Sequence, residues 1–289
     1  MPYHFADALN KQILLKSPIM LGLDPNFDLM PESMRPVPGN KLETKEKLWL
    51  FCKMIIDQTH DLVCGIKPQS AYFEQYGVLG VEVLAMVLEY AKSLGLPVIM
   101  DAKRGDIGPT STAYSKAYLE PSVYGSDLES DALTINPFLG LDTLESFVNC
   151  CNRGKGMFLL VKTSNPGSGF IQDIDDNGLT VSQNLADYLN NEGLESLGQS
   201  GYSNLGAVVG ATKPEDAQEL RVRMPRTIFL APGIGAQGGD VEAIKKLMDE
   251  QGLGVIIPIS RAINYPKQAD YQNYAEAVRS SCQHYVAMF

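Results

Sequence analysis

Short apolar runs recur along the whole chain and alternate with amphipathic stretches. Eight runs stay apolar through their middle instead of alternating with polar residues, which is typical of parallel strands covered on both faces. Nearly all of them end in a polar residue or a glycine. The runs lie at residues 18–24, 62–68, 97–103, 131–137, 156–163, 205–212, 227–233 and 254–260.

Helical periodicity fills most of the intervals between these runs. The clearest case is 80–95, GVEVLAMVLEYAKSLG, which ends in a glycine, a frequent helix stop. Strand followed by helix, eight times over, predicts an α/β fold: a (β/α)8 TIM barrel, with residues 1–289 as a single domain. A doubly wound open sheet is the structural alternative, but no GxGxxG follows the first run. The other expected helices lie at 41–60, near 109–120, 141–152, 214–223 and 240–251, and at 267–284.

Two of the predicted βα loops are long. A proline-rich loop, 25–39, follows the first strand, and the segment 164–204 follows the fifth. The second segment holds a predicted helix at 181–191 and otherwise has the composition of an extended loop. Long loops at this end of a barrel often cover the active site, so we expect 164–204 to be a lid insertion, with a merely decorative loop as the alternative.

Composition and charge narrow the possible functions. The formal net charge is −10, so the chain lacks the basic face that nucleic-acid binding requires. No apolar run approaches the ~18 residues of a membrane span, and the first residues, MPYHFADALNKQ, do not resemble a secretory signal. The five cysteines form no C-x-x-C pattern, which predicts reduced thiols and a cytoplasmic protein. The three histidines lie far apart in the sequence, which predicts neither a metal site nor a histidine-based triad.

Charged side chains gather where the second and third strands end, the end at which barrels place their catalytic groups. Lys67 ends the second strand, and Asp101 and Lys103 end the third. Residues two apart on a strand share a face, so Asp101 and Lys103 are expected to lie together beside Lys67. Each opposite charge would favour the charged form of its neighbour, leaving Lys103 as an ammonium proton donor. A solvated cluster of ion pairs without function is the alternative.

A second cluster suggests an anion site. The stretch APGIGAQGGDVEAIKKL (231–247) is a glycine-rich loop that leads into a predicted helix, an arrangement suited to phosphate, although an ordinary turn is the alternative. Loops after strands seven and eight are the recurrent phosphate site of this fold, and Arg261 follows strand eight. A guanidinium group is a bidentate donor to phosphate. These residues would create local positive potential in an acidic protein.

The stretch DAKRGDIGPTSTAY (101–114) resembles the D-x-K-x-x-D-I signature of the orotidine 5′-phosphate decarboxylases, in their longer subfamily. Companion segments occur in the same order as in that family, so the resemblance covers essentially the whole chain. These segments are LGLDP, GIKPQ, TSNPG, PGIGAQGGD and SRAI.

The resemblance implies cofactor-free decarboxylation of orotidine 5′-monophosphate to UMP and CO2, the last step of de novo pyrimidine nucleotide synthesis. Lys67, Asp101 and Lys103 would form the charged network around the scissile carboxylate, with Lys103 protonating C6. Asp106, which lies beyond the strand, would reach across the interface of a homodimer into the partner's site. The implied substrate contacts are Asp24 to the ribose, Ser164 to the pyrimidine, Gln237 and Arg261 to the phosphate, and Ile107, Thr110, Gly235 and Ser260.

Two other functions stay open from the residues alone. Related barrels with the same D-x-K-x-x-D pattern are metal-dependent enzymes that act on sugar phosphates, and a chelator would distinguish them from a metal-free decarboxylase. A catalytically inactive barrel kept as a binding module is the other possibility, and turnover of substrate would exclude it.

Overall fold

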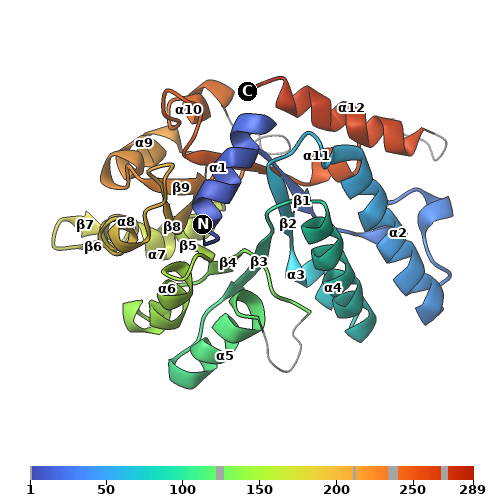
Figure 1. The fold of residues 1–289 in the computed structure, drawn as a ribbon, viewed down its shortest axis with the longest axis horizontal. Helices are drawn as coiled ribbons and strands as arrows, with labels where there is room; N and C mark the ends of the chain where they lie inside the picture. Colours follow the sequence, from blue (N-terminus) through green and yellow to red (C-terminus); the bar gives the residue numbers. More distant parts are fainter. Residues whose placement is uncertain (1, 122–126, 211–212, 234–239, 268–272) are drawn as a thin grey trace.

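Eight parallel strands form one sheet that curls into a barrel in the computed structural model (Figure 1). The structure describes residues 2–121, 127–210, 213–233, 240–267 and 273–289. The strands pair in the order β2-β1-β10-β9-β8-β5-β4-β3, and isolated parallel bridges join β2 to β3 and complete the ring. The strands are β1 (Ile19–Leu23), β2 (Gly65–Pro68), β3 (Ile99–Arg104), β4 (Ala132–Ile135), β5 (Gly156–Lys162), β8 (Ser203–Val209), β9 (Thr227–Leu230) and β10 (Val255–Ile259).

Each of the eight apolar runs coincides with one of these strands, which confirms the predicted barrel and makes the open-sheet alternative wrong. Every residue of β1, β2, β4, β8 and β9 is buried. The reason is that helices cover the outside of the sheet while side chains fill its inside.

The surrounding helices follow the predicted order, with three differences in length. The helix expected at 141–152 starts as a 3-10 turn at Leu141–Leu144 and is α-helical only at Glu145–Cys151. The helix expected at 240–251 ends at Lys245, and the described part of the helix expected at 267–284 begins at Tyr274. Residues 268–272 of that expectation lie outside the described part of the chain. The helices of the barrel wall are α2 (Lys41–Thr59), α3 (Ser70–Glu74), α4 (Val78–Ser93), α5 (Gly108–Leu119), α6 (Glu145–Cys151), α8 (Val181–Glu192), α9 (Pro214–Arg223), α10 (Val241–Lys245), α11 (Arg261–Asn264) and α12 (Tyr274–Val286).

An additional helix, α1 (Phe5–Leu15), lies across the N-terminal end of the barrel (Figure 1). Sequence analysis did not predict it. Phe5, Leu9 and Ile13 are spaced four apart and form its buried stripe, which packs on side chains inside the barrel. The ring of Phe5 meets that of Phe158 edge-on, with centroids 6.0 Å apart. This helix closes the end of the barrel opposite to the strand ends that carry the charges.

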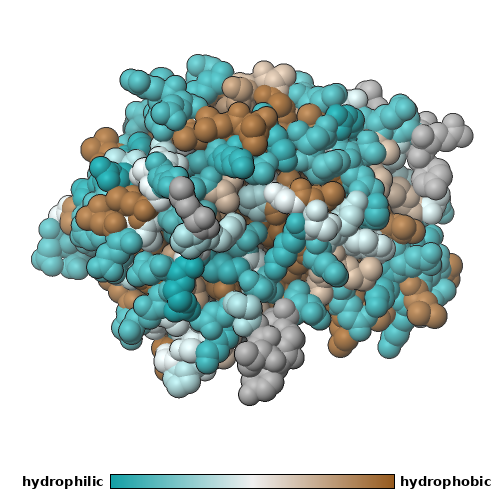
Figure 2. Space-filling model, viewed as in Figure 1, coloured by the Kyte–Doolittle hydropathy of each residue, from teal (hydrophilic) through white to brown (hydrophobic). Residues whose placement is uncertain are grey.

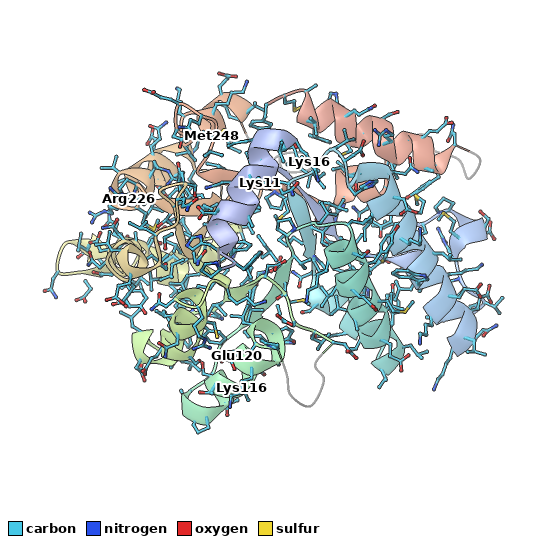
Figure 3. All side chains as sticks on the ribbon, viewed as in Figure 1. Lys11, Lys16, Lys116, Glu120, Arg226 and Met248 are labelled. Atoms are coloured by element: carbon cyan, nitrogen blue, oxygen red, sulfur yellow. The ribbon has the colours of Figure 1, made fainter. Side chains whose placement is uncertain are left out.

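The surface around α1 is mostly hydrophilic, with separate apolar patches (Figure 2). Lys11 and Lys16 belong to this face (Figure 3), and the Lys16 ammonium donates to the carbonyl of His60 at 2.8 Å. Within the described part of the chain, no helix combines the length and apolarity that crossing a membrane would require.

The segment 164–204 contains the helix predicted at 181–191, which is α8, together with shorter elements where we expected an extended loop. A helical turn, α7 (Gly169–Gln172), and a small hairpin, β6 (Asp175–Asp176) with β7 (Leu179–Thr180), come first. A capping box between Thr180 and Gln183 then starts α8. Only residues 164–180 therefore precede the helix at the end of the barrel where β5 finishes. After α8 the chain runs to the opposite end, where the amides of Gln199 and Ser200 donate to Asp7 of α1.

Candidate active site

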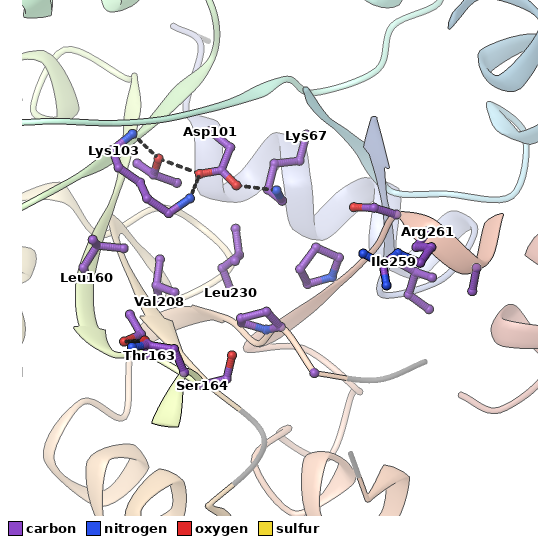
Figure 4. A pocket seen from close by; sticks show the side chains of 17 residues that line it. Lys67, Asp101, Lys103, Leu160, Thr163, Ser164, Val208, Leu230, Ile259 and Arg261 are labelled. Atoms are coloured by element: carbon purple, nitrogen blue, oxygen red, sulfur yellow. Dashed lines mark hydrogen bonds and ion pairs between the residues drawn. The ribbon is translucent and has the colours of Figure 1, made fainter. Parts of the chain in front are cut away.

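A cavity of about 310 Å³ opens where the strands end (Figure 4). Its lining comes from the ends of seven strands, β2, β3, β4, β5, β8, β9 and β10, and from the loops that follow β5, β9 and β10. A barrel that is filled on the inside and closed by α1 thus leaves its C-terminal mouth open to a ligand. The lining residues are Lys67, Asp101, Lys103, Thr134, Leu160, Thr163, Ser164, Asn165, Val208, Leu230, Pro232, Gly233, Pro258, Ile259, Ser260, Arg261 and Ala262.

Two lysines form ion pairs with one buried carboxylate at the edge of this cavity (Figure 4). The Lys67 ammonium lies 2.5 Å from Oδ2 of Asp101, and the Lys103 ammonium lies 2.5 Å from Oδ1. The side chains of Lys67 and Asp101 are each 8% exposed, whereas that of Lys103 is 44% exposed. The two ammonium groups therefore differ in exposure: that of Lys67 is buried, whereas that of Lys103 faces the cavity.

Burial and neighbouring charges shift the pKa values of Asp101 and Lys67 in opposite directions. Burial by itself would raise the pKa of Asp101, but the Lys67 and Lys103 ammonium groups outweigh it and hold that pKa well below its usual range. Burial would lower the pKa of Lys67, but the carboxylates of Asp101 and Asp24 raise it. Asp101 and Lys67 are therefore both charged at neutral pH.

The structure brings Asp101 and Lys103 together through a bulge in β3, not through simple strand alternation. The register between β3 and β4 shifts between Met100 and Arg104. Inside this interval Lys103 has φ = 48°, in the left-handed region that residues other than glycine seldom occupy. The two side chains meet as predicted from the sequence, but for a different geometric reason.

Asp24 lies next to this charged group, in the connection that follows β1. Burial raises the pKa of its carboxyl group, while Lys67 and the hydroxyl of Ser260 lower it by smaller amounts. Within the described part of the chain, its Oδ1 atom is buried without a hydrogen-bond partner. A ligand hydroxyl could satisfy this acceptor, because an unpaired buried oxygen is costly.

The predicted pyrimidine and phosphate residues lie on other sides of the same cavity (Figure 4). Ser164 follows β5, while Ser260 and Arg261 follow β10. The predicted contacts Gly235 and Gln237 lie outside the described residues.

Asp24 lies beside the charged group but is not part of the cavity lining. Three further predicted residues lie away from the cavity lining of their own chain: Asp106, Ile107 and Thr110. They occupy the turn into α5 and its first residues, and Oδ1 of Asp106 accepts from the N–H of Ile107 at 2.8 Å. The Ile107 side chain is 61% exposed. The structure therefore does not bring these residues into the site formed by Lys67, Asp101 and Lys103.

Several residues of the cavity carry no clear signal in the sequence. Thr134 contacts Asp101 directly, and the only signal for it was a single hydroxyl inside the apolar run DALTINP. Leu160, Val208 and Leu230 form an apolar wall between the charged group and Ser164 (Figure 4). Nothing in the apolar runs distinguishes these three from core residues.

Comparisons with known proteins agree on one family. Residues 19–274 match the model described as the orotidine 5′-phosphate decarboxylase / HUMPS family. The chain is 42% identical over 291 residues to the orotidine 5′-phosphate decarboxylase of Rhodopirellula baltica, covering 96% of each protein. It is 40% identical to that of Caldicellulosiruptor bescii, covering 95% of this chain and 92% of the relative.

Solved structures show the same relationship. Leishmania donovani OMP decarboxylase superimposes with a TM-score of 0.76 and 28% identity, covering 99% of this chain and 98% of the other. Leishmania donovani UMP synthase superimposes with a TM-score of 0.78 and 30% identity. The match covers 99% of this chain but only 56% of the synthase, so the chain spans about half of that larger protein.

Proposed function

Since the chain belongs to the orotidine 5′-phosphate decarboxylase family, and so converts orotidine 5′-monophosphate to UMP and CO2 in pyrimidine biosynthesis, we propose that Lys67, Asp101 and Lys103 form its catalytic centre. One observation carries this proposal: a buried aspartate at the mouth of the barrel is held between two ammonium groups at 2.5 Å each. An ionised carboxylate and a cavity-facing cation side by side match what loss of CO2 from this substrate requires.

The proposed reaction uses the side chains alone. The C6–carboxylate bond breaks, CO2 leaves, and the electron pair of that bond stays on C6. The Lys103 ammonium lies where this negative charge develops and stabilises it more than it stabilises the bound substrate, which lowers the barrier. Its Nζ proton then bonds to C6 and gives UMP, and solvent reprotonates the amine. Asp101 lies against the substrate carboxylate, and Lys67 keeps Asp101 ionised.

Most of the proposed substrate contacts belong to side chains that line the cavity. We assign the pyrimidine edge to Ser164, the phosphate to Ser260 and Arg261, and a ribose hydroxyl to the unpaired oxygen of Asp24. Gly235 and Gln237 join the phosphate side in this proposal. The apolar wall of Leu160, Val208 and Leu230 excludes water beside the reacting carbon, which strengthens the electrostatic effect of Lys103.

We further propose that a second copy of the chain completes the site as a homodimer. Asp106, Ile107 and Thr110 would then contact the substrate bound in the partner subunit. The support is an exposed apolar surface beside them: Phe138, Leu139 and Leu141 are each more than 40% exposed. Their loop adjoins the turn before Asp106, because Gly105 lies against the carbonyl of Asn136. Exposed apolar patches of this kind mark association sites.

The segment 164–204 is proposed to supply the lid, through its part that precedes α8. This part is tied to β5: Gln172 exchanges two hydrogen bonds of 2.9 Å with Thr163, and Asp173 pairs with the buried Lys162. Thr163 and Ser164, the first residues after β5, both line the cavity next to these anchors. A lid held at Ser164 would couple closure to recognition of the pyrimidine.

The protein is proposed to act in the cytoplasm, as one domain of 289 residues. The five cysteines are all buried and free of disulfides, as expected of a protein from a reducing compartment.

The test of the proposed function is turnover of orotidine 5′-monophosphate by the purified protein, followed by loss of the orotate absorbance. We expect UMP to form at the same rate with and without a chelator. Absence of UMP together with magnesium-dependent turnover of a sugar phosphate would contradict the proposal and favour the metal-dependent branch of this group of barrels.

A further inference from the structure

The bulge in β3 creates a backbone N–H that the sheet does not pair. In the pairing of the two strands, Met100 lies opposite Leu133, and Arg104 lies opposite Ile135. The three residues of β3 between these pairs therefore face a single residue of β4, Thr134. Lys103 belongs to this interval and has a left-handed φ of 48°. Conformations of this kind persist only where the surrounding structure over-determines them. The N–H of Lys103 therefore needs a partner other than a strand carbonyl.

The side chain of Thr134 is that partner, and it also contacts the catalytic carboxylate. Its Oγ1 accepts the Lys103 N–H at 2.9 Å and donates to Oδ1 of Asp101 at 3.0 Å. Thr134 is 1% exposed, and its β-branched side chain has restricted rotation about χ1. One fixed oxygen thus connects the backbone of the proton donor to the carboxylate beside it.

We propose that Thr134 is a positioning residue for the decarboxylation, and this rests on the roles proposed above for Asp101 and Lys103. Its hydroxyl proton is committed to Asp101 and a lone pair to Lys103, so it takes no part in proton transfer. Its effect is geometric. The Lys103 side chain is long and 44% exposed, and anchoring its backbone restricts the positions that Nζ can reach. A small displacement of a reacting group lowers turnover steeply.

The direct test compares Thr134→Val with Thr134→Ser. Valine keeps the shape of threonine but removes both hydrogen bonds, whereas serine keeps the hydroxyl. We expect kcat to fall about 100-fold in Thr134→Val, the scale of a misplacement near 1 Å, with little change in KM. Thr134→Ser should recover most of that loss.

The matched control is Thr59→Val in α2. Thr59 is fully buried and its hydroxyl donates to the carbonyl of Ile55 at 2.8 Å, but it does not line the cavity. This variant should keep the wild-type kcat. An unchanged kcat in Thr134→Val would overturn the proposal, and so would equal losses in Thr134→Val and Thr134→Ser.

Amide hydrogen exchange at Lys103 supplies a measurement that does not depend on turnover. We expect the Lys103 amide to exchange faster in Thr134→Val and to regain protection in Thr134→Ser. An inactive wild-type protein would contradict the proposed function, but it would leave this measurement intact. Unchanged exchange at Lys103 in Thr134→Val would refute the role of Thr134 by itself.

Discussion

At the scale of single residues, the proposed chemistry depends on the hydrogen bonds and ion pairs that the Asp101 carboxylate accepts. Its two oxygens accept from Lys67, Lys103 and Thr134, all within 3.0 Å. These donors favour its ionised form, although burial opposes it. In the proposed mechanism, this charged carboxylate holds Lys103 beside the reacting carbon and repels the carboxylate of the substrate.

Replacement of Lys103 by alanine tests the proton donor. In the proposed mechanism, the variant lacks both the cation that stabilises the carbanion and the proton that ends the reaction, so kcat should fall at least about 1,000-fold. The matched control is Lys116→Ala, an exposed lysine of α5 (Figure 3), which should leave turnover unchanged. Near-normal rates in Lys103→Ala would remove this residue from the mechanism.

Replacement of Asp101 by asparagine tests the charge through the pH dependence of stability. The lysines lower the pKa of Asp101 in the folded state. Its charge therefore stabilises the fold above the pKa of an unfolded aspartate, about 3.9, and this stabilisation is lost as the pH falls further. At pH 7 we expect Asp101→Asn to lower the free energy of unfolding by about 3–5 kcal/mol, the cost of breaking a buried ion pair.

Urea denaturation at neutral pH and below pH ~4 measures this difference. The gap between wild type and Asp101→Asn should shrink in acid, because below pH ~4 the unfolded wild-type chain binds a proton at Asp101 while the folded protein keeps this carboxylate ionised. Asp176→Asn, at an exposed position of the β6 strand, is the control that should show no gap. A gap independent of pH would contradict the assigned charge.

At the scale of elements, α1 contributes to the stability of the barrel at one end, and the strand ends carry the candidate active site at the other. The helix buries Phe5, Leu9 and Ile13 against the inside of the barrel. At the other end, the strands carry the side chains that line the cavity. A change in α1 should therefore affect folding without touching the site.

Leu9→Ala tests this division. Leu9 is fully buried, so its truncation should cost about 2–5 kcal/mol of unfolding free energy. Leu14 lies on the same helix but is 60% exposed, and Leu14→Ala should change stability by less than about 0.5 kcal/mol. In both variants KM should match the wild type at temperatures where the protein is folded. A change in KM would show that α1 influences the cavity.

At the scale of the whole molecule, the proposed homodimer makes each active site depend on two chains. Mixing inactive Lys103→Ala and Asp106→Ala subunits would restore one intact site in every mixed dimer, with Lys103 from one chain and Asp106 from the other. Random exchange should recover about a quarter of wild-type activity. No recovery in mixtures shown to exchange subunits would mean that Asp106 acts within its own chain or not at all.

Local patterns in the sequence predicted most of the strands and helices, but they missed α1 and the early end of one helix. The apolar runs located all eight strands because a strand buried on both faces leaves an uninterrupted apolar signature. The helix α1 was missed although its stripe has regular spacing, because it precedes the first strand and has no place in the repeating strand–helix pattern. The helix expected at 240–251 ends early because the chain turns after Lys245.

By itself, the sequence determined the barrel, the end of the barrel that carries chemistry and the identity of the charged residues, since each of these depends on residue type and on spacing along the chain. Only the tertiary structure decided how they are arranged. The bulge at Lys103, the hydroxyl of Thr134 between Lys103 and Asp101, and the apolar wall depend on which strands become neighbours. The contact between the Lys103 N–H and the Thr134 hydroxyl, 31 positions apart, depends on the irregular pairing of β3 with β4, which no local pattern encodes.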